Sequence, residues 1–231
     1  MNAILMNCIA IFTSVILATA AHAAGLADIS NNDAAAGLKG ALTQGAQAAV
    51  SGLGKQDGFL RNDRVKIPLP ESLHQVEGVM RTLGMGKYAD ELVTTMNRAA
   101  EAAVVEAKPL LVNAVKNMSV QDAKGILSGG QDAATQYFKR TTSGPLTEKF
   151  LPIVTQATQK VKLAEKYNEF AGKGAKFGLV DVKDADINSY VTRKALDGLF
   201  LMVAEEEKKI RQDPVGAASS IISKVFGAIG K

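Results

Sequence analysis

The sequence holds little of the chemistry on which most enzymes and metal proteins depend. Its 231 residues include one Cys, two His and no Trp, and aromatic residues make up only 5%. A single Cys excludes an internal disulfide and a cysteine-rich zinc site. The 47% of hydrophobic and 22% of charged residues are typical of a folded chain, so extensive disorder is also excluded. The length suits one domain.

Residues 1–23 contain no Asp, Glu, Lys or Arg and have the features of a secretory signal peptide. The apolar run over residues 9–18 is shorter than the roughly 20 residues that a membrane-spanning helix needs. After this run comes Ala21-His22-Ala23, a site of the kind that signal peptidase cleaves. We therefore predict cleavage before Ala24 and export to a periplasm. Retention of the segment as an N-terminal anchor is the alternative.

Cleavage would remove most of the reactive side chains. Cys8 and His22 both lie in residues 1–23, which leaves His74 as the one His and no Cys in residues 24–231. A Cys nucleophile and a multi-His metal site are then excluded, and neither a metal nor another cofactor is expected. Because Cys8 precedes the apolar run, we expect no lipid anchor. We interpret His74 as a surface or capping residue.

Helix patterns recur throughout residues 24–231, and strand patterns barely appear. Apolar spacing, caps and breakers predict helices over residues 30–53, 71–83, 88–117, 119–128, 132–140, 146–170, 187–211 and 214 onward. Pro109 should kink or divide the third of these helices, because proline lacks an N–H and clashes with the preceding turn. Pro152 should bend the sixth. We predict an all-α fold with a single domain of about eight helices, kinked at prolines.

Turn and cap residues mark the expected joints between these helices. Capping boxes are predicted at Ser30–Asp33 and at Ser119–Asp122. Gly84 should close the second helix. Residues 141–145 are predicted to form a joint, with Pro145 near the start of the next helix. Residues 172–178, which contain three glycines, are predicted to form a flexible loop.

Three predictions concern burial. Leu199–Val203 is apolar on all sides of its helix and should lie at the centre of the fold. Glu205–Glu207 should be the solvated end of that helix, because three consecutive acids point in different directions. The buried stripe of the second helix should consist of Leu73, Val76, Met80 and Leu83.

Three stretches of the chain resemble a known bacterial family. They are Phe59-Leu60 with Lys66–Pro70; Ile126–Gly130 with Asp132–Phe138 and Arg140–Ser143; and Tyr190–Thr192 with Lys194–Phe200, Glu205–Glu207, Ile210-Arg211 and Asp213-Pro214. Together they are similar to the bacterial domain of unknown function number 4197, from about Gly37 to Phe226. The resemblance implies an exported, helical bacterial protein and supplies no catalytic residues. Some members carry lipoprotein signals, a pattern from which this sequence departs.

The richest polar segment covers residues 128–148. Gly129 and Gly130 precede a predicted helix start, where backbone N–H groups can bind an anion and Arg140 would add charge. The candidate ligand-binding residues in this segment are Asp132, Tyr137, Arg140, Thr141 and Thr142. However, no Gly-Lys-Ser/Thr follows the glycines, as it would in a phosphate-binding loop. We favour the alternative that the segment is a helix end and a tight turn.

Lys194 and Asp197 complete the set of candidates. Asp197 belongs to an otherwise apolar helix, and a buried carboxylate needs a partner, which Arg140 could supply across the fold. Asp197 would then be a pocket carboxylate or a metal ligand. The alternative, which we favour, is a structural ion pair or an exposed edge position.

The net charge of +4 is spread along the chain. The densest basic stretch contains Lys160, Lys162, Lys166, Lys173 and Lys176. Binding of nucleic acid is not expected, because it usually requires a tighter patch with stacking aromatics. A weak attraction to an anionic membrane surface or cell-wall polymer remains open. We favour the simpler interpretation of a solvated face.

These observations lead to three hypotheses about function. The first, which we favour, is a non-enzymatic periplasmic protein that binds a partner protein or another envelope component. The second is a carrier of a lipid or other apolar ligand in a pocket between helices, which a closed apolar cavity would support. The third is a carboxylate-based enzyme, with or without a metal, centred on Asp197. An exposed apolar patch would support the first hypothesis.

Overall fold

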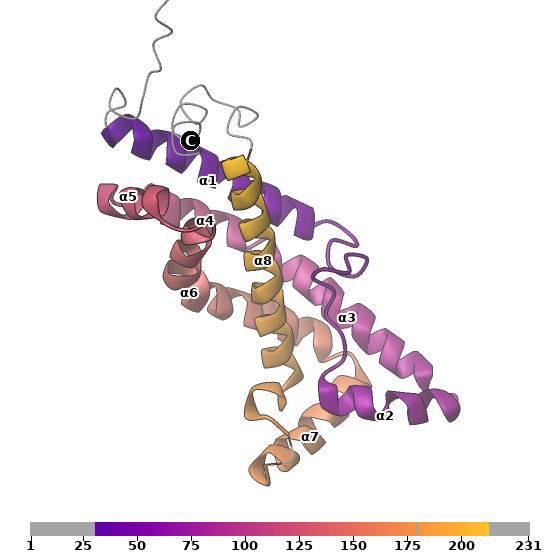
Figure 1. The fold of residues 1–231 in the computed structure, drawn as a ribbon. Helices are drawn as coiled ribbons and strands as arrows, with labels where there is room; N and C mark the ends of the chain where they lie inside the picture. Colours follow the sequence, from indigo (N-terminus) through magenta and orange to yellow (C-terminus); the bar gives the residue numbers. More distant parts are fainter. Residues whose placement is uncertain (1–30, 179, 213–231) are drawn as a thin grey trace, which may run out of the picture.

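Every regular element of the described chain is helical. The computed structural model describes residues 31–178 and 180–212, and within them the predicted all-α fold is confirmed (Figure 1). Its α-helices are α1 (Asn31–Leu53), α2 (Glu71–Thr82), α3 (Gly86–Val104), α4 (Ala107–Lys116), α5 (Val120–Ser128), α6 (Ala133–Thr158), α7 (Lys162–Lys176) and α8 (Ile187–Gln212). A short 3-10 helix, η2 (Val182–Asp184), precedes α8. The predicted signal peptide, the cap at Ser30 and the helix from residue 214 lie outside the described residues.

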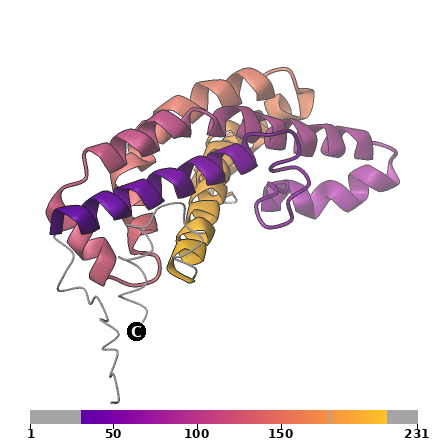
Figure 2. The same cartoon turned by 90° about the horizontal axis from the view of Figure 1, so that it is seen from above.

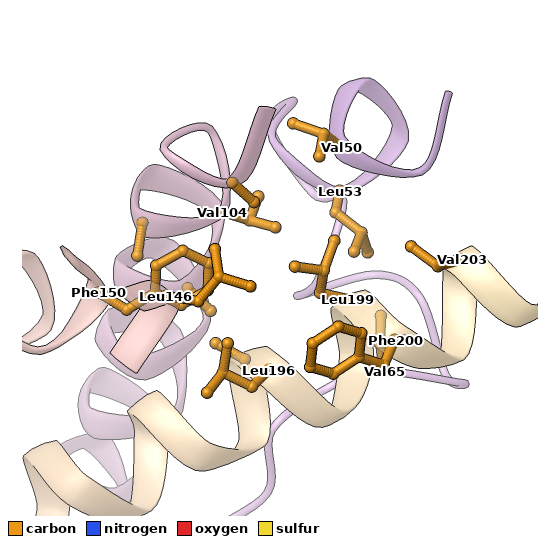
Figure 3. Close-up of a cluster of buried hydrophobic side chains, with 14 of the residues drawn as sticks. Val50, Leu53, Val65, Val104, Leu146, Phe150, Leu196, Leu199, Phe200 and Val203 are labelled. Carbon is orange, nitrogen blue, oxygen red and sulfur yellow. The ribbon is translucent and has the colours of Figure 1, made fainter. Parts of the chain in front are cut away.

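The centre of the fold is the crossing of α8 over the other long helices. α8 packs most extensively against α6 and also contacts α1 and α3. Both views show that α8 crosses α1 at a steep angle (Figure 1, Figure 2). Side chains from all four helices meet at this crossing, among them Leu53, Val104, Leu146, Phe150 and Leu199, each buried (Figure 3). Burial of each such side chain stabilises the fold by about 1.5–3 kcal/mol.

The predicted central run in α8 is only partly correct. Leu199, Phe200 and Val203 are buried, as predicted. Leu201, however, is 38% exposed, and Met202 is only half-buried. Complete burial of the run is therefore wrong, because one side of α8 is not covered by any other helix of residues 31–178 and 180–212.

The predicted division near Pro109 is confirmed. α3 ends at Val104 and α4 begins at Ala107, so that Pro109 falls in the first turn of α4. In the first turn of a helix, the missing N–H of proline has no intrahelical partner to lose. Five small or apolar residues spaced by three or four positions along this stretch are all buried: Leu92, Met96, Ala99, Ala103 and Ala107.

The predicted joint at residues 141–145 is wrong, because α6 is continuous through both Pro145 and Pro152. A proline inside a helix costs about 3 kcal/mol. Leu146 and Phe150 follow Pro145 on the buried side of α6, and their packing offsets this cost only if the helix continues. Two hydroxyls also bond to helix carbonyls, from Thr142 to Phe138 at 2.7 Å and from Ser143 to Lys139 at 2.6 Å.

The predictions for residues 146–178 also need correction. The helix predicted over residues 146–170 is interrupted at residues 159–161, and α7 then runs to Lys176. The predicted flexible loop is therefore wrong for Gly172 and Gly174, which are helical. Gly178 alone of the three has a positive φ, of 72°, and lies beyond the end of α7.

In α2, the predicted end is confirmed and the predicted stripe is partly wrong. Gly84 has a φ of 74°, which glycine adopts without strain, and it follows the last helical turn. Leu73 is buried and Met80 is half-buried, as predicted. Leu83, in contrast, is 69% exposed. The C-terminal end of α2, which Leu83 follows, lies at the edge of the molecule, where no described helix covers it (Figure 1).

Candidate binding surfaces

Four of the seven candidate residues line one hollow between α4, α5 and α6. They are Tyr137, Arg140, Thr141 and Thr142. The hollow has a volume of about 460 Å³, and Leu110, Asn113, Ala114, Asn117, Asp122 and Pro145 complete its lining. The candidates share this hollow because they occupy neighbouring turns of α6, a continuous helix that the sequence analysis did not predict.

The four candidate side chains of this hollow make contacts within the fold. Arg140 lies 3.8 Å from the Asp122 carboxylate and stacks over the Tyr137 ring, 5.5 Å from its centroid. The Tyr137 hydroxyl donates to the Ala114 carbonyl at 2.8 Å. The hydroxyls of Thr141 and Thr142 donate to carbonyls one turn earlier in α6. The hollow therefore offers an exposed guanidinium but no activated nucleophile.

The titration of two groups follows from this arrangement. Hydrogen bonds from the hydroxyl and the amide of Ser119, followed by the charge of Arg140, hold the pKa of Asp122 below its ordinary value. The bond from the Ser119 amide, together with a bond from the Asp122 amide to the Ser119 hydroxyl oxygen, forms the capping box of α5 and confirms its prediction. Burial raises the pKa of Tyr137, and the nearby Asp122 charge raises it further. Both shifts favour the protonation states in which these groups stabilise the packing of α5 and α6.

The other three candidates lie outside the hollow. Asp132 is exposed and accepts a hydrogen bond from Gln136 at 2.8 Å. Lys194 is half-buried with its ammonium over the Tyr190 ring, 5.9 Å from the centroid. Asp197 is exposed, which matches the structural interpretation that we favoured for it. Arg140 pairs with Asp122, so the partnership suggested for Arg140 and Asp197 is wrong.

The most enclosed carboxylate of α8 is one that we predicted to be solvated. Glu207 is 4% exposed and lies at the N-terminus of α6. It accepts bonds from the Ala134 amide at 3.0 Å and from the Thr135 amide at 2.9 Å, and it pairs with Arg211 at 2.8 Å. The prediction for Glu207 is therefore wrong. A carboxylate binds the free amides of a helix start, and here that start belongs to a distant part of the chain.

Two further buried polar residues in α3 were not singled out by the sequence analysis. Asn97 accepts from the Ile67 amide at 2.8 Å and donates to the Ile67 carbonyl at 2.9 Å. Glu101 accepts from the amides of Phe59 and Leu60 at 3.0 and 3.1 Å. Together they fasten segment 55–70, which connects α1 to α2, to α3. Their spacing of four residues, on the face that also carries the buried alanines, was a signal that could have identified them.

An apolar groove lies between α2 and α7. It has a volume of about 480 Å³ and is open to solvent. It is lined by Ser72, Leu73, Met80, Met85, Leu163, Lys166, Tyr167, Phe170, Ala171 and Val180. Apart from Lys166 at the rim and two hydroxyls, every lining side chain is apolar. The groove was not predicted, because its two walls are separated by about 80 residues of sequence.

The two hydroxyls of the groove have partners inside the protein. Tyr167 donates to the Asp184 carbonyl at 2.5 Å, and its oxygen lies 3.1 Å from the Ser72 hydroxyl. Burial raises the pKa of Tyr167. Because these polar atoms are satisfied, Lys166 at the rim is the one lining side chain that can still donate a hydrogen bond to an occupant. The part of an occupant that lies within the groove must therefore be apolar.

Residues 31–178 and 180–212 contain neither a cluster of metal ligands nor a membrane-spanning helix. No group of three or more His, Cys, Asp and Glu side chains is placed to hold a metal ion. Over the same residues, none of the helices combines the length and the apolarity needed to cross a membrane.

His74 is exposed and bonds to Glu77 at 2.9 Å on the surface of α2.

Comparison with known proteins identifies a family only. A family model described as "Protein of unknown function (DUF4197)" matches residues 28–227, which is most of the chain. The match covers all three stretches on which the resemblance was based. No curated protein and no solved structure has significant similarity to the chain.

Proposed function

Because the chain belongs to the DUF4197 family, whose description states no activity, we propose its function from surface geometry: it is a non-enzymatic binding protein of the cell envelope. The binding site is the apolar groove between α2 and α7. The partner is an apolar segment of another envelope protein. The location rests on the signal-peptide pattern of residues 1–23.

The observation that carries this proposal is the apolar surface around the groove. Met85 and Phe170, which line the groove, are 44% and 65% exposed, and Val79 and Leu83 near the C-terminal end of α2 are also exposed. Soluble proteins rarely leave several large apolar side chains together in water unless another molecule covers them. Met80 and Met85 add flexible side chains that adapt to the shape of an occupant.

The shape of the groove favours a protein segment over a small ligand. Pockets for small ligands bury most of the ligand surface. This groove is open along its length, so that an acyl chain lying in it would stay partly in water. A partner helix would insert a few apolar side chains between α2 and α7, and the rest of that helix would cover the rim. A lipid carrier remains the second candidate, because the lining itself is apolar.

Site-specific photocrosslinking tests the proposal. A photoreactive residue replaces Met85, which is 44% exposed in the groove. A matched control replaces Val105, which is 50% exposed between α3 and α4 and does not line the groove. Cells that produce and export the full chain are irradiated, and the adducts are identified by mass. We expect a discrete protein adduct from position 85 and none from position 105.

The other outcomes decide between the rival functions. A lipid adduct at position 85, with lipid retained in native mass spectra of the purified protein, would overturn our proposal. It would show that the protein is a lipid carrier. Equal adducts at positions 85 and 105, or none at 85, would overturn both. Met85→Glu should abolish the specific adduct of a second photoreactive residue at Leu163, which lines the opposite wall.

A further inference from the structure

One face of α7 alternates apolar and basic side chains. Leu163, Lys166, Phe170, Lys173 and Phe177 are separated by steps of three and four residues, so they lie on one side of the helix and its C-terminal cap. Phe177 is 80% exposed. The Lys173 ammonium lies over the Phe170 ring, 5.8 Å from its centroid. The first three of these residues line the groove, but Lys173 and Phe177 lie beyond it.

The adjoining 3-10 helix extends this surface. Val182 in η2 is 78% exposed, and its neighbour Lys183 is also exposed. η2 packs against α7. Together they form one end of the molecule, away from the crossing of α8 with α1 (Figure 1). This end therefore presents three large exposed apolar side chains, those of Phe170, Phe177 and Val182, among lysines.

This end of the molecule carries a net positive charge. Residues 160–184, which include all of η2, contain six Lys and four acidic residues, a net charge of +2 out of +4 for the whole chain. Lys166 and Lys173 share Glu169, each at 3.3 Å. Lys162 and Lys176 are exposed and form no ion pair with any described residue. The apolar side chains are thus surrounded by cations that are available to an anionic partner.

We propose that α7 and η2 dock this end of the protein onto an anionic lipid surface. The rings of Phe170 and Phe177 would lie at the boundary between headgroups and acyl chains, and the lysines would contact lipid phosphates. Interfaces between proteins are depleted of lysine, whereas helices that lie in a membrane surface combine lysine with phenylalanine in this way. The inference goes beyond the proposed function, because Phe177, Val182 and Lys176 do not line the groove.

Cosedimentation with vesicles tests this docking. The full chain is produced with its own N-terminal segment, and the form recovered from the envelope is mixed with phosphatidylglycerol-containing or pure phosphatidylcholine vesicles. We expect binding to the anionic vesicles alone, with an affinity that falls as salt rises. Lys173→Glu with Lys176→Glu should weaken binding at least about tenfold, because each lysine near such a surface contributes about fivefold. Phe177→Ser with Val182→Ser should weaken it by a similar factor.

Matched variants separate this surface from general charge and from the groove. Lys108→Glu with Lys149→Glu makes the same charge change on α4 and α6, and it should leave most of the binding intact. Met85→Glu should bind vesicles like the parent, even if the groove hypothesis fails. Equal binding to neutral vesicles, no binding, or equal losses in both lysine pairs would overturn the proposal. So would a dimer that Phe177→Ser dissociates, because the surface would then belong to a second copy.

Discussion

The carboxylate of Glu207 caps the helix that begins beside Thr135, across 72 residues of sequence. One carboxylate oxygen accepts from the Thr135 amide at 2.9 Å and from its hydroxyl at 2.8 Å. The other accepts from the Ala134 amide at 3.0 Å, and Arg211 balances the charge. The contact fastens the C-terminal end of α8 to the start of α6, the two helices that form the centre of the fold.

We expect Glu207→Gln to lower the free energy of unfolding by about 3 kcal/mol. The amide of glutamine cannot accept on both sides, so that one donor at the start of α6 loses its acceptor, and the charge-assisted bond from Arg211 is weakened. Urea denaturation followed by circular dichroism measures the change. Glu206→Gln is the control, because Glu206 pairs with Lys209 at the surface and should change stability by less than about 1 kcal/mol. Equal effects of the two substitutions would contradict the capping role.

Asn97→Ala should destabilise the protein by about 2–3 kcal/mol. The substitution leaves the buried amide and carbonyl of Ile67 without partners, and an unsatisfied buried group costs about 1–3 kcal/mol. Hydrogen exchange should show faster exchange at the Ile67 amide in particular. Asn113→Ala on the exposed side of α4 should change stability by less than about 0.5 kcal/mol. Unchanged protection at Ile67 would show that Asn97 does not hold this segment.

Gly198→Ala should destabilise the protein by about 1–3 kcal/mol, since overpacking forces neighbouring side chains to move. A Cβ at this position would lie 2.7 Å from the Phe59 ring and 3.2 Å from the Val65 Cβ. Gly125→Ala in α5 should change the stability in the opposite direction, because a Cβ there meets nothing within 4 Å. Alanine there should stabilise the helix by up to about 1 kcal/mol. Thermal melts of the two variants should shift in opposite directions, and shifts of the same sign would argue against close packing at Gly198.

The capping box of α5 should contribute stability that depends on pH. The pKa of Asp122 is lowered from its ordinary value of 3.8, so its contribution is full above that value and is lost as the pH falls through the folded-state pKa. Asp122→Asn should therefore be less stable than the parent at about pH 6, and the difference should shrink at about pH 2.5. Urea midpoints at both values measure it, with Asp63→Asn as the control for charge. A difference that does not depend on pH would contradict the role of the ionised carboxylate.

The features predictable from the sequence are those that neighbouring residues determine. Ser119 with Asp122 marked the start of α5, Gly84 marked the end of α2, and Pro109 marked the division of α3 from α4. Capping bonds, a positive φ and the missing N–H of proline act within one turn, so a local pattern contains them. The family resemblance rested on longer stretches and was confirmed.

The features that were missed depend on residues distant in sequence. Pro145 is a local breaker, but burial of Leu146 and Phe150 against other helices keeps α6 continuous. Glu207 has the same chemistry as its two acidic neighbours, and only the position of α6 decides which of them becomes buried. The groove likewise exists only where α2 and α7 come together. Of the candidate residues, those on α6 share one hollow because helical turns place them there, whereas Asp197 belongs to another surface.

The cap on α6 also affects the order in which the parts of the protein can fold. Synthesis delivers Ala134 and Thr135 well before Glu207, so their amides must stay hydrated until the last part of α8 has emerged. A chain that lacks its C-terminal quarter therefore leaves the start of α6 uncapped and the central crossing without α8. Any nascent or truncated form that ends before residue 207 would remain open and accessible to proteases and chaperones.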